Sequence, residues 1–583
     1  MKNDLLVLAI GLYLSFLLSP YVTAQNIQKD IQPLTIDGQS RITTQYANRQ
    51  GTNQEIPASY LRWNFSNTFN VYGLPLRFDM LLSTENNVSR QRLNAYTFDI
   101  DFKSYLRNKA IDHLGFLKHF RTFEIGTFRP RYSKLTLQGI AVNGVNVEFQ
   151  PGKFYMAFAN GTSKRAVTNK NYPDDESFDR KILFGKIGYG KPDRSHFYLT
   201  FMHAEDETGS LNPSPDPWEY QGDTLIHESD TFYHPPQTYN RFLKPRENLL
   251  AGSELSLKFF EQKFELRGEV AASLITRNTE SPDLLTDEND FEGFITDIYT
   301  PNTSSSLDYA YDIGASFKEG NTSIEAGMKK IGPGYESLGI AYLQKDKLEY
   351  NARLSQRLFR RKLSVRAFYK TYHNNLLEWS LTGTSYTSFG LGMTLRLRDL
   401  PYLSVNYSPF LQETESEQNL LSSKATMLSV NTGHTYKIGK LRSSTNFSYS
   451  LNKNDIESAT MDQSINSQNF SFSESLSFLI PLTLTAGVGY HSIDRLDQSD
   501  KISTVYFRGS YGKYNGWRNM LGVRFSAKNS ESTKTGFSYT STMKASEFAK
   551  FQLTVRQNIF TDTVTPVQDY DEFIARLSII LIW

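Results

Sequence analysis

Basic residues recur at even spacings in three neighbouring segments of the second half of the chain. These residues are Arg353, Arg357, Arg366, Lys370, Arg396 and Arg398. Side chains of a β-strand point alternately to its two faces, so an even spacing places the charges of each strand on one face. Charges on the inner face of a channel select among ions. Acidic Glu349 and Asp399 lie nearby, so ion pairing across strands is the simpler interpretation.

The sequence carries no signature of catalysis. Its nine histidines are scattered, and no HExxH, GxSxG or GxxxxGK[ST] segment occurs. We therefore expect no enzyme and no cofactor, although residues gathered from distant strands could still build a surface active site. The absence of cysteine excludes disulfides and thiolate metal ligands. A net charge of +2 offers no electrostatic basis for binding nucleic acid.

The elements that would position the charges are strands with one apolar face. Between Leu61 and Val71, apolar and polar residues alternate, and the same period of two recurs through the second half of the chain. Aromatic residues make up 14% of the chain, while its mean hydropathy is only −0.46. Beyond the first residues, no apolar run approaches the ~20 residues of a membrane helix. This combination is typical of a transmembrane β-barrel, in which half of each strand faces lipid.

Short turns and longer polar connections alternate along the chain. Short turns are expected near 72–75, 150–152, 190–194, 260–263, 319–321, 360–362, 399–401, 438–440, 480–482, 513–516 and 546–548. Outer-membrane barrels have short periplasmic turns and long extracellular loops. We predict an all-β, antiparallel up-and-down barrel of about 26 strands, with 24 also compatible, and with both termini periplasmic. A string of soluble β-sandwich domains or a secreted adhesin is the alternative, but it does not explain the two-sided rule of loop lengths.

The segment Asp571–Trp583 reads as the closing strand of such a barrel. Its apolar residues of one parity include Phe573, Leu577, Ile579, Leu581 and Trp583. In outer-membrane barrels, a final strand of this kind is also recognised by the barrel-assembly machinery. We therefore predict that these residues are an assembly signal.

The first residues of the sequence indicate export. Leu5–Leu18 is a short apolar stretch, and Val22-Thr23-Ala24 supplies small residues before Gln25. We predict a signal peptide over 1–24 and a single barrel over 25–583. The predicted location is the outer membrane of a Gram-negative cell, where the chain crosses the lipid many times.

Two long polar segments, 204–249 and 277–306, are rich in acidic residues. The first also carries prolines and aromatic residues, so it is expected to fold over the barrel mouth or to bind a surface partner. In the second, Asp287, Asp290 and Glu292 could bind calcium, but the spacing does not fit an EF-hand. We therefore favour solvated acids and predict no metal site.

The segment 106–141 exceeds what a plain barrel requires. Leu106–Phe120 has apolar residues at helical spacing, and connection order places it at the periplasmic end. A short helix beneath or inside the lumen is expected, and a pair of strands is the alternative.

Three runs carry a resemblance to a known group of proteins. They are GTFRPRYSKLTLQG over 126–139, GVNVEFQPGKF over 144–154 and GPGYESLG over 332–339. With them the chain resembles a group of large outer-membrane β-barrels of the Bacteroidota type. The resemblance implies location and fold but no established activity. A proline-rich segment on a long loop suits an inward-folded constriction, for which Arg129, Pro130, Arg131 and Tyr132 are the candidates. A rigid turn without contact to cargo is the alternative.

Three classes of function remain open. The leading one is a wide pore or transport component whose lumen is obstructed by its own loops or by a partner, because an open hole of about 26 strands would be harmful. The second is a non-conducting barrel subunit of a larger secretion, surface-display or barrel-assembly complex. The third is a surface enzyme or adhesin. The expected partners are outer-membrane lipid, the assembly machinery and other outer-membrane or surface proteins.

Overall fold

The computed structural model describes a large part of the chain. The described residues are 34–51, 57–71, 74–85, 93–100, 102, 116–167, 176–211, 218–220, 223–227, 230–234, 237–239, 243–283, 299, 301–416, 420–458, 462–495, 498–512, 516–529 and 531–583. The predicted signal peptide 1–24 and the candidate calcium ligands Asp287, Asp290 and Glu292 lie outside them. No helix in the described part is long and apolar enough to cross a membrane.

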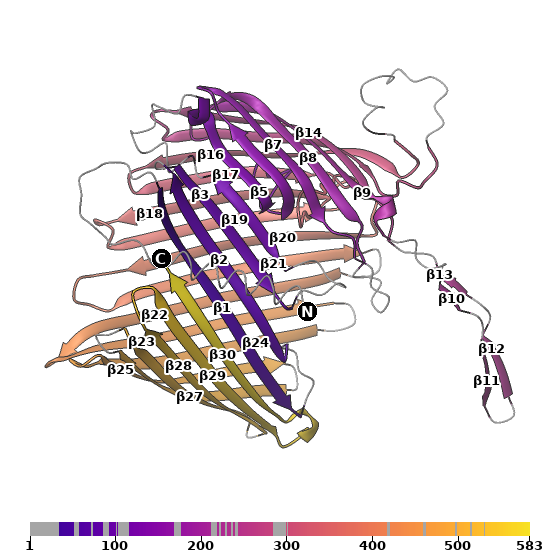
Figure 1. The fold of residues 1–583 in the computed structure, drawn as a ribbon. Coiled ribbons are helices and arrows are strands. Elements are labelled where there is room, and N and C mark those ends of the chain that lie inside the picture. Colours follow the sequence, from indigo (N-terminus) through magenta and orange to yellow (C-terminus); the bar gives the residue numbers. More distant parts are fainter. Residues whose placement is uncertain are drawn as a thin grey trace.

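Twenty-six strands form one antiparallel sheet that closes on itself (Figure 1). They are β1 (Leu34–Gln50), β2 (Ser59–Val71), β3 (Leu74–Ser83), β4 (Ala95–Ile100), β5 (Phe120–Phe128), β6 (Val142–Phe149), β7 (Phe154–Lys164), β8 (Asp179–Gly190), β9 (His196–Glu207), β14 (Glu247–Phe259), β15 (Phe264–Thr276), β16 (Ser305–Glu319), β17 (Thr322–Ile331), β18 (Lys347–Leu358), β19 (Leu363–Asn374), β20 (Thr382–Leu395), β21 (Tyr402–Ser416), β22 (Leu420–Ile438), β23 (Leu441–Glu457), β24 (Asp462–Ser477), β25 (Leu482–Arg495), β26 (Gln498–Gly512), β27 (Arg518–Lys528), β28 (Ser532–Lys544), β29 (Ala549–Asp562) and β30 (Tyr570–Ile582).

The barrel closes where its first strand meets its last, indigo β1 beside yellow β30 in Figure 1. Every residue from Gln39 to Gln50 pairs with one from Ile582 to Asp571. Beyond this ladder, the amide of Trp583 donates to the carbonyl of Gly38 over 3.1 Å. Because both edges of the sheet are paired, no free strand edge remains there. The predicted antiparallel barrel and its number of strands are confirmed.

Alternate residues of each strand face the outside and the lumen, as the alternation in the sequence predicted. On β8, Leu183 and Ile187 are exposed on the outer face, whereas Ile182 and Phe184 are buried on the lumen face. On β20, Phe389 and Leu391 continue the exposed apolar outer face. Strand formation therefore follows from alternation, because each strand can offer one face to each environment.

The connections are short at one end of the barrel, here called the short-turn end. They join β2 to β3, β6 to β7, β8 to β9, β14 to β15 and then each even-numbered strand to the next as far as β28 to β29, at the positions that the sequence predicted. Gly320 and Gly439 have positive φ angles of 56° and 59°. Tight hairpins require this left-handed backbone, which glycine adopts without steric cost. The opposite end is called the long-loop end.

The predicted insertion over 106–141 divides into different parts. Phe120–Phe128 is a wall strand, β5, which pairs with β4 and β6. The residues 129–141 form a loop at the long-loop end, on the other side from the connection between β4 and β5. A tail of the expected helix, 116–119, is a single 3-10 turn, and 103–115 lie outside the described residues.

The ladder of paired residues between β4 and β5 is short beside that connection. Among the described residues, strand β4 pairs with β5 through Thr97, Phe98 and Asp99. Gly126, which lies opposite Thr97, has a φ of 104°, and a Cβ there would lie 2.2 Å from the carbonyl oxygen of Tyr96. Only glycine allows the two strands to approach this closely.

The predicted long loop 204–249 is shorter than expected, because β9 and β14 extend into it and leave 208–246. Its described parts include two short antiparallel ribbons, β10 (Trp218–Tyr220) with β13 (Gln237–Tyr239) and β11 (Asp223–His227) with β12 (Asp230–His234). Figure 1 shows these ribbons extending away from the barrel, not folded over its mouth.

Candidate functional site in a divided lumen

Two loops of the long-loop end fold into the lumen. Lumen loop A (129–141) joins β5 to β6, and lumen loop B (332–346) joins β17 to β18. Leu135 and Leu137 of loop A and Tyr335 of loop B are fully buried. They belong to one hydrophobic core with lumen-facing residues of β7, β8, β9 and β14–β17. One side of the barrel is therefore packed like the interior of a soluble protein.

Loops A and B bind each other through backbone carbonyls. The hydroxyl of Tyr335 donates to the carbonyl of Leu135 over 2.8 Å, and that of Ser337 to the carbonyl of Thr136 over 2.5 Å. The amide of Gln138 donates to the carbonyl of Gly339 over 3.1 Å. A Cβ on Gly339 would lie 2.4 Å from the Thr136 oxygen, so this contact requires glycine. The two loops form one unit, here called the lumen plug.

A carboxylate of the wall holds loop A in place. Glu269 on β15 accepts hydrogen bonds from the hydroxyl of Ser133, the amide of Leu135 at 3.1 Å and the amide of Lys134 at 3.3 Å. The ammonium of Lys134 lies 3.2 Å from Asp312 on the neighbouring strand β16. Hydrogen bonds to an ionised acceptor are stronger than neutral ones, so Glu269 is the principal polar anchor of the loop.

A buried cation forms a second anchor. Lys186 on β8 donates to the carbonyl of Tyr132 over 2.6 Å and to Glu254 over 2.5 Å. Glu254 also contacts His196 at 3.0 Å. The Tyr132 ring stacks on Phe184 with centroids 5.0 Å apart. A charge this buried is tolerated because its donors are paired, and the pairing fixes the position of the loop.

Loop B is fixed by an ionic cluster near the barrel rim. The carboxylate of Glu336 binds Arg246, Lys345 and, at 3.4 Å, Arg277. Burial alone would raise the pKa of Glu336, but the hydrogen bond from Lys345 and the neighbouring arginine charges lower it below its ordinary value. Farther inward, the amide of Leu338 donates to Asn248 over 3.0 Å.

The four candidate constriction residues all lie in the lumen plug. Pro130 and Tyr132 are buried against the wall, whereas Arg129 and Arg131 are exposed. Arg129 donates to the carbonyl of Gly139 over 3.2 Å, at the other end of the same loop. These residues therefore pack the loop itself, and only the two arginines present side chains to solvent.

Sequence analysis did not predict that loop B enters the lumen. It also did not predict that loop B contacts residues 133–137. A usable signal was present in β7 and β8, where Phe154–Phe158 and Ile182–Phe184 are apolar at nearly every position. Strands that lack alternation are covered on both faces. Their lumen face therefore had to pack against protein.

The predicted basic cluster is only partly assembled. Arg353, Arg366 and Lys370 line a lumen cavity of about 610 Å³ with Arg267 and the acidic Glu325 and Glu349. Lys370 lies 3.4 Å from Glu349, which also binds Lys347 at 2.7 Å. The cavity is thus lined by both basic and acidic side chains.

Three members of that cluster lie elsewhere. Arg357 faces the lumen closer to the short-turn end, opposite Ser364. Arg396 and Arg398 are in the turn after β20, where Arg398 is 3.5 Å from Asp399 and both side chains are almost fully exposed. Their placement on a lumen face was wrong, because β20 ends at Leu395 and both arginines lie in the turn that contains Asp399, whose φ of 60° is left-handed.

A second polar cavity, of about 380 Å³, lies at the closure of the barrel. It is lined by Arg41, Arg62, Arg556 and Arg576 together with neutral polar side chains. Sequence analysis did not predict this cluster, because the four arginines come from both ends of the chain and meet only when β1 pairs with β30.

The residues of the predicted assembly signal share the outer face of β30. Phe573 and Leu577 are exposed, and Ile579 and Leu581 are partly exposed. The Trp583 ring lies 5.9 Å from Phe65, and its indole nitrogen donates to Asn67 over 2.8 Å. Recognition by the assembly machinery stays a prediction.

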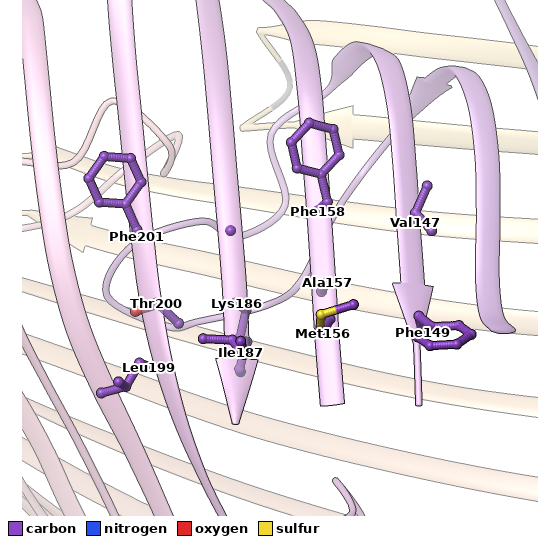
Figure 2. A pocket seen from close by; sticks show the side chains of 11 residues that line it. Val147, Phe149, Met156, Ala157, Phe158, Lys186, Ile187, Leu199, Thr200 and Phe201 are labelled. Carbon is purple, nitrogen blue, oxygen red and sulfur yellow. The ribbon is translucent and has the colours of Figure 1, made fainter. Parts of the chain in front are cut away.

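A further hollow, of about 430 Å³, opens on the outer face of β6–β9. Figure 2 shows Phe158 and Phe201 on either side of β8, where Gly185 leaves space because it has no side chain. Its lining is apolar apart from Lys186 and Thr200, which belong to the lumen face. This hollow belongs to the outer apolar surface, separate from the polar lumen.

In the described part of the chain, no group of three His, Asp or Glu residues could hold a metal ion. No protein-family model matches the sequence, and no curated protein matches it.

Several solved outer-membrane proteins are similar to the structure at a low level. One is the outer membrane protein OpdK of Pseudomonas aeruginosa, with 10% identity, 58% of this chain and 94% of that chain covered, and a TM-score of 0.28. A BenF-like porin from Pseudomonas fluorescens Pf-5 has 9% identity, coverages of 58% and 92%, and a TM-score of 0.29. A chain of the E. coli P pilus tip assembly intermediate PapC-PapD-PapK-PapG has 10% identity, coverages of 96% and 62%, and a TM-score of 0.39. Scores this low carry no argument about function.

Proposed function

We propose that the chain is an integral outer-membrane β-barrel that carries solutes through one half of its lumen. The division of the lumen is the observation that carries this proposal. The plug packs against nine of the 26 wall strands, β5–β9 and β14–β17, and the part of the lumen that it occupies is called the filled half. On the lumen face of β21–β28, by contrast, the register places polar residues that are exposed, among them Asn406, Asn446, Arg508, Arg524 and Ser538.

The outer face supports the membrane location. Exposed aliphatic and aromatic side chains continue from strand to strand, as on β14, β16, β20 and β30. A water-soluble protein rarely exposes an apolar surface this extensive, whereas a transmembrane barrel requires one. The short-turn end is then periplasmic and the long-loop end extracellular, as in other outer-membrane barrels.

The plug supports a transport function because the barrel is wide. With strands about 4.8 Å apart and tilted about 40°, a circular barrel of this size would be about 50 Å across. An opening of that width would abolish the permeability barrier, so a transport barrel must obstruct part of its cross-section. A loop plug anchored to the wall does this without closing the polar half.

Single-channel recording tests the proposal. The purified full chain in a planar bilayer should give discrete openings, and replacing Lys134–Gln138 with glycines should enlarge them several-fold. The matched control removes residues 218–239, which contain the ribbons that extend away from the barrel and should leave conductance unchanged. A wild-type barrel and a plug variant that both insert but remain silent would contradict the proposal.

A second candidate is a subunit of a larger surface assembly. The ribbons β10–β13 favour it, because they extend away from the barrel and each two-stranded sheet pairs with no other described strand. Purification from membranes in mild detergent should then recover a partner with the wild type and lose it with the 218–239 deletion. Equal recovery from both would contradict this role for the ribbons.

A further inference from the structure

The cavity at the barrel closure gathers arginines from four consecutive strands. Arg41 lies on β1, Arg62 on β2, Arg556 on β29 and Arg576 on β30, and all four line the same space. They are called the seam arginines below. In the register of the sheet, Arg41 pairs with Asn64 and Ile580, and Arg576 pairs with Gln45 and Thr554. All these residues share the lumen face, so the guanidinium groups converge on the polar half of the lumen.

The remaining lining is neutral and able to form hydrogen bonds. It consists of Thr43, Tyr60, Asn64, Thr540, Gln552, Thr554 and Ser578. The lining includes no acidic and no aliphatic side chain. Guanidinium groups surrounded by hydroxyl and amide groups suit a ligand that carries charged oxygens, because both kinds of group donate hydrogen bonds to it.

The charge of the seam arginines is only partly balanced. Arg62 lies 2.6 Å from Glu85 at the rim, and Arg576 donates to the neutral amide oxygen of Gln45 over 2.6 Å. Within the described residues, neither Arg41 nor Arg556 forms an ion pair with an acid. In the described part of the chain, these two guanidinium groups therefore face the lumen without a protein counter-charge.

The strands on both sides of the seam are also poor in acidic residues. On β26–β30, β1 and β2, acidic residues occur only close to strand ends, and they are Asp37, Asp500, Asp562, Asp571 and Glu572. Asp500 is 3.1 Å from Lys528, and Glu572 is 3.4 Å from Arg49. Arg508 and Arg524 add two cations to the lumen face near the middle of β26 and β27. On β3, Arg77 and Asp79 face the lumen together.

The other basic cavity is different in this respect. Around Arg353, Arg366 and Lys370, two carboxylates line the same space, and one of them pairs with Lys370. The four cations of that cavity are partly balanced by these two carboxylates. At the seam the positive potential extends into the lumen, where it raises the local concentration of anions.

We propose that the seam arginines form a binding site for oxyanions, carboxylate or phosphate, and that the polar half of the lumen conducts anions in preference to cations. This inference rests on the proposed transport function and names the class of solute. Fixed cations on a pore wall lower the energy of an entering anion and raise that of an entering cation.

Reversal-potential measurements on the purified full chain test the inference. Under a KCl gradient, the wild type should favour chloride over potassium by about threefold or more. The double variant Arg41→Gln and Arg556→Gln should bring the permeability ratio close to unity. The matched control Arg396→Gln and Arg398→Gln removes the same charge from an exposed turn and should leave the ratio unchanged.

Block of the chloride current then separates the two sources of oxyanion. Inorganic phosphate and succinate are added in turn, and stronger block by one identifies the group that the site prefers. Block by either should fall several-fold in the seam variant. A gel shift on boiling, measured for each variant, confirms that the barrel has folded.

Three results would overturn the inference. A wild-type channel that favours cations, or a seam variant with unchanged selectivity and block, would refute it while leaving the transport function intact. A folded wild type that conducts no ion, with or without its plug, would refute both.

Discussion

The two halves of the lumen have the same wall but different contents. On β7, the inward residues are Tyr155, Ala157 and Ala159, and they pack against the lumen plug. On β23, the inward residues are Ser444, Asn446 and Ser448, which pair with serines of β24. The outer faces of both strands carry large apolar residues, such as Phe158 on β7 and Phe447 on β23. Only the inward parity differs, so the inner residues of each strand determine whether protein or solvent fills that part of the barrel.

The difference is also energetic. Small alanines and glycines on the filled side bring the wall close to the plug, where burial of each large apolar side chain contributes about 1.5–3 kcal/mol. The polar side offers hydroxyl and amide groups that water satisfies as well as protein does. A mutation should therefore change the free energy of packing strongly on the filled side and only slightly on the polar side.

The most damaging change to the filled half is Leu135→Asp. An unpaired carboxylate at this fully buried position costs several kcal/mol, which undocking of the plug relieves. The barrel should still fold, because its strand ladders are untouched, and its conductance should rise several-fold. The control Arg131→Asp, at an exposed position of the same loop, should conduct like the wild type. Identical conductance of both variants would show that the plug does not obstruct the pore.

A smaller effect is expected from Glu269→Gln. The amide keeps the shape of the side chain but weakens charge-assisted hydrogen bonds, each worth about 1.5–3 kcal/mol. Hydrogen exchange at the Leu135 and Lys134 amides should become at least several-fold faster. Glu265→Gln is the control, because Glu265 lies on the same face of β15 and bonds Ser256 of the wall instead. Unchanged exchange in the Glu269 variant would remove this residue as an anchor.

The smallest effect concerns acid pH and the rim end of loop B. The folded-state pKa of Glu336 lies below its ordinary value of 4.5, so the stability that it contributes is complete above that value. It is lost as the pH falls through the lowered pKa. Hydrogen exchange over 332–346 should therefore accelerate in this acid range and remain steady between pH 6 and 8. Glu336→Gln should abolish the dependence, and an onset near neutral pH would contradict this origin.

The sequence was sufficient for the wall because the wall depends on local patterns. Alternation around Leu61–Val71 and in the second half of the chain placed the strands, and residues such as Gly320 and Gly439 marked the tight turns. Closure was also predictable, since an even number of strands with one apolar face must bury its edges.

The contents of the lumen depend on contacts between distant residues. The interlocking of Thr136 with Ser337 joins positions about 200 residues apart, and the seam arginines meet only after closure. Loop 204–249 has the proline and aromatic content of a structured loop, but composition does not determine its direction. Arg396 and Arg398 were assigned to a lumen face because parity was extended past the end of β20.

Accessibility of single cysteines tests the divided lumen most directly. The sequence contains no cysteine, so each introduced thiol is the only one. Ala271→Cys lies in the core around the plug, and Ser538→Cys lies on the exposed lumen face of β28. A charged, membrane-impermeant thiol reagent should label Ser538→Cys rapidly and leave Ala271→Cys unlabelled until the plug is disrupted by Leu135→Asp. Equal labelling of both positions in the otherwise unaltered barrel would contradict the division of the lumen.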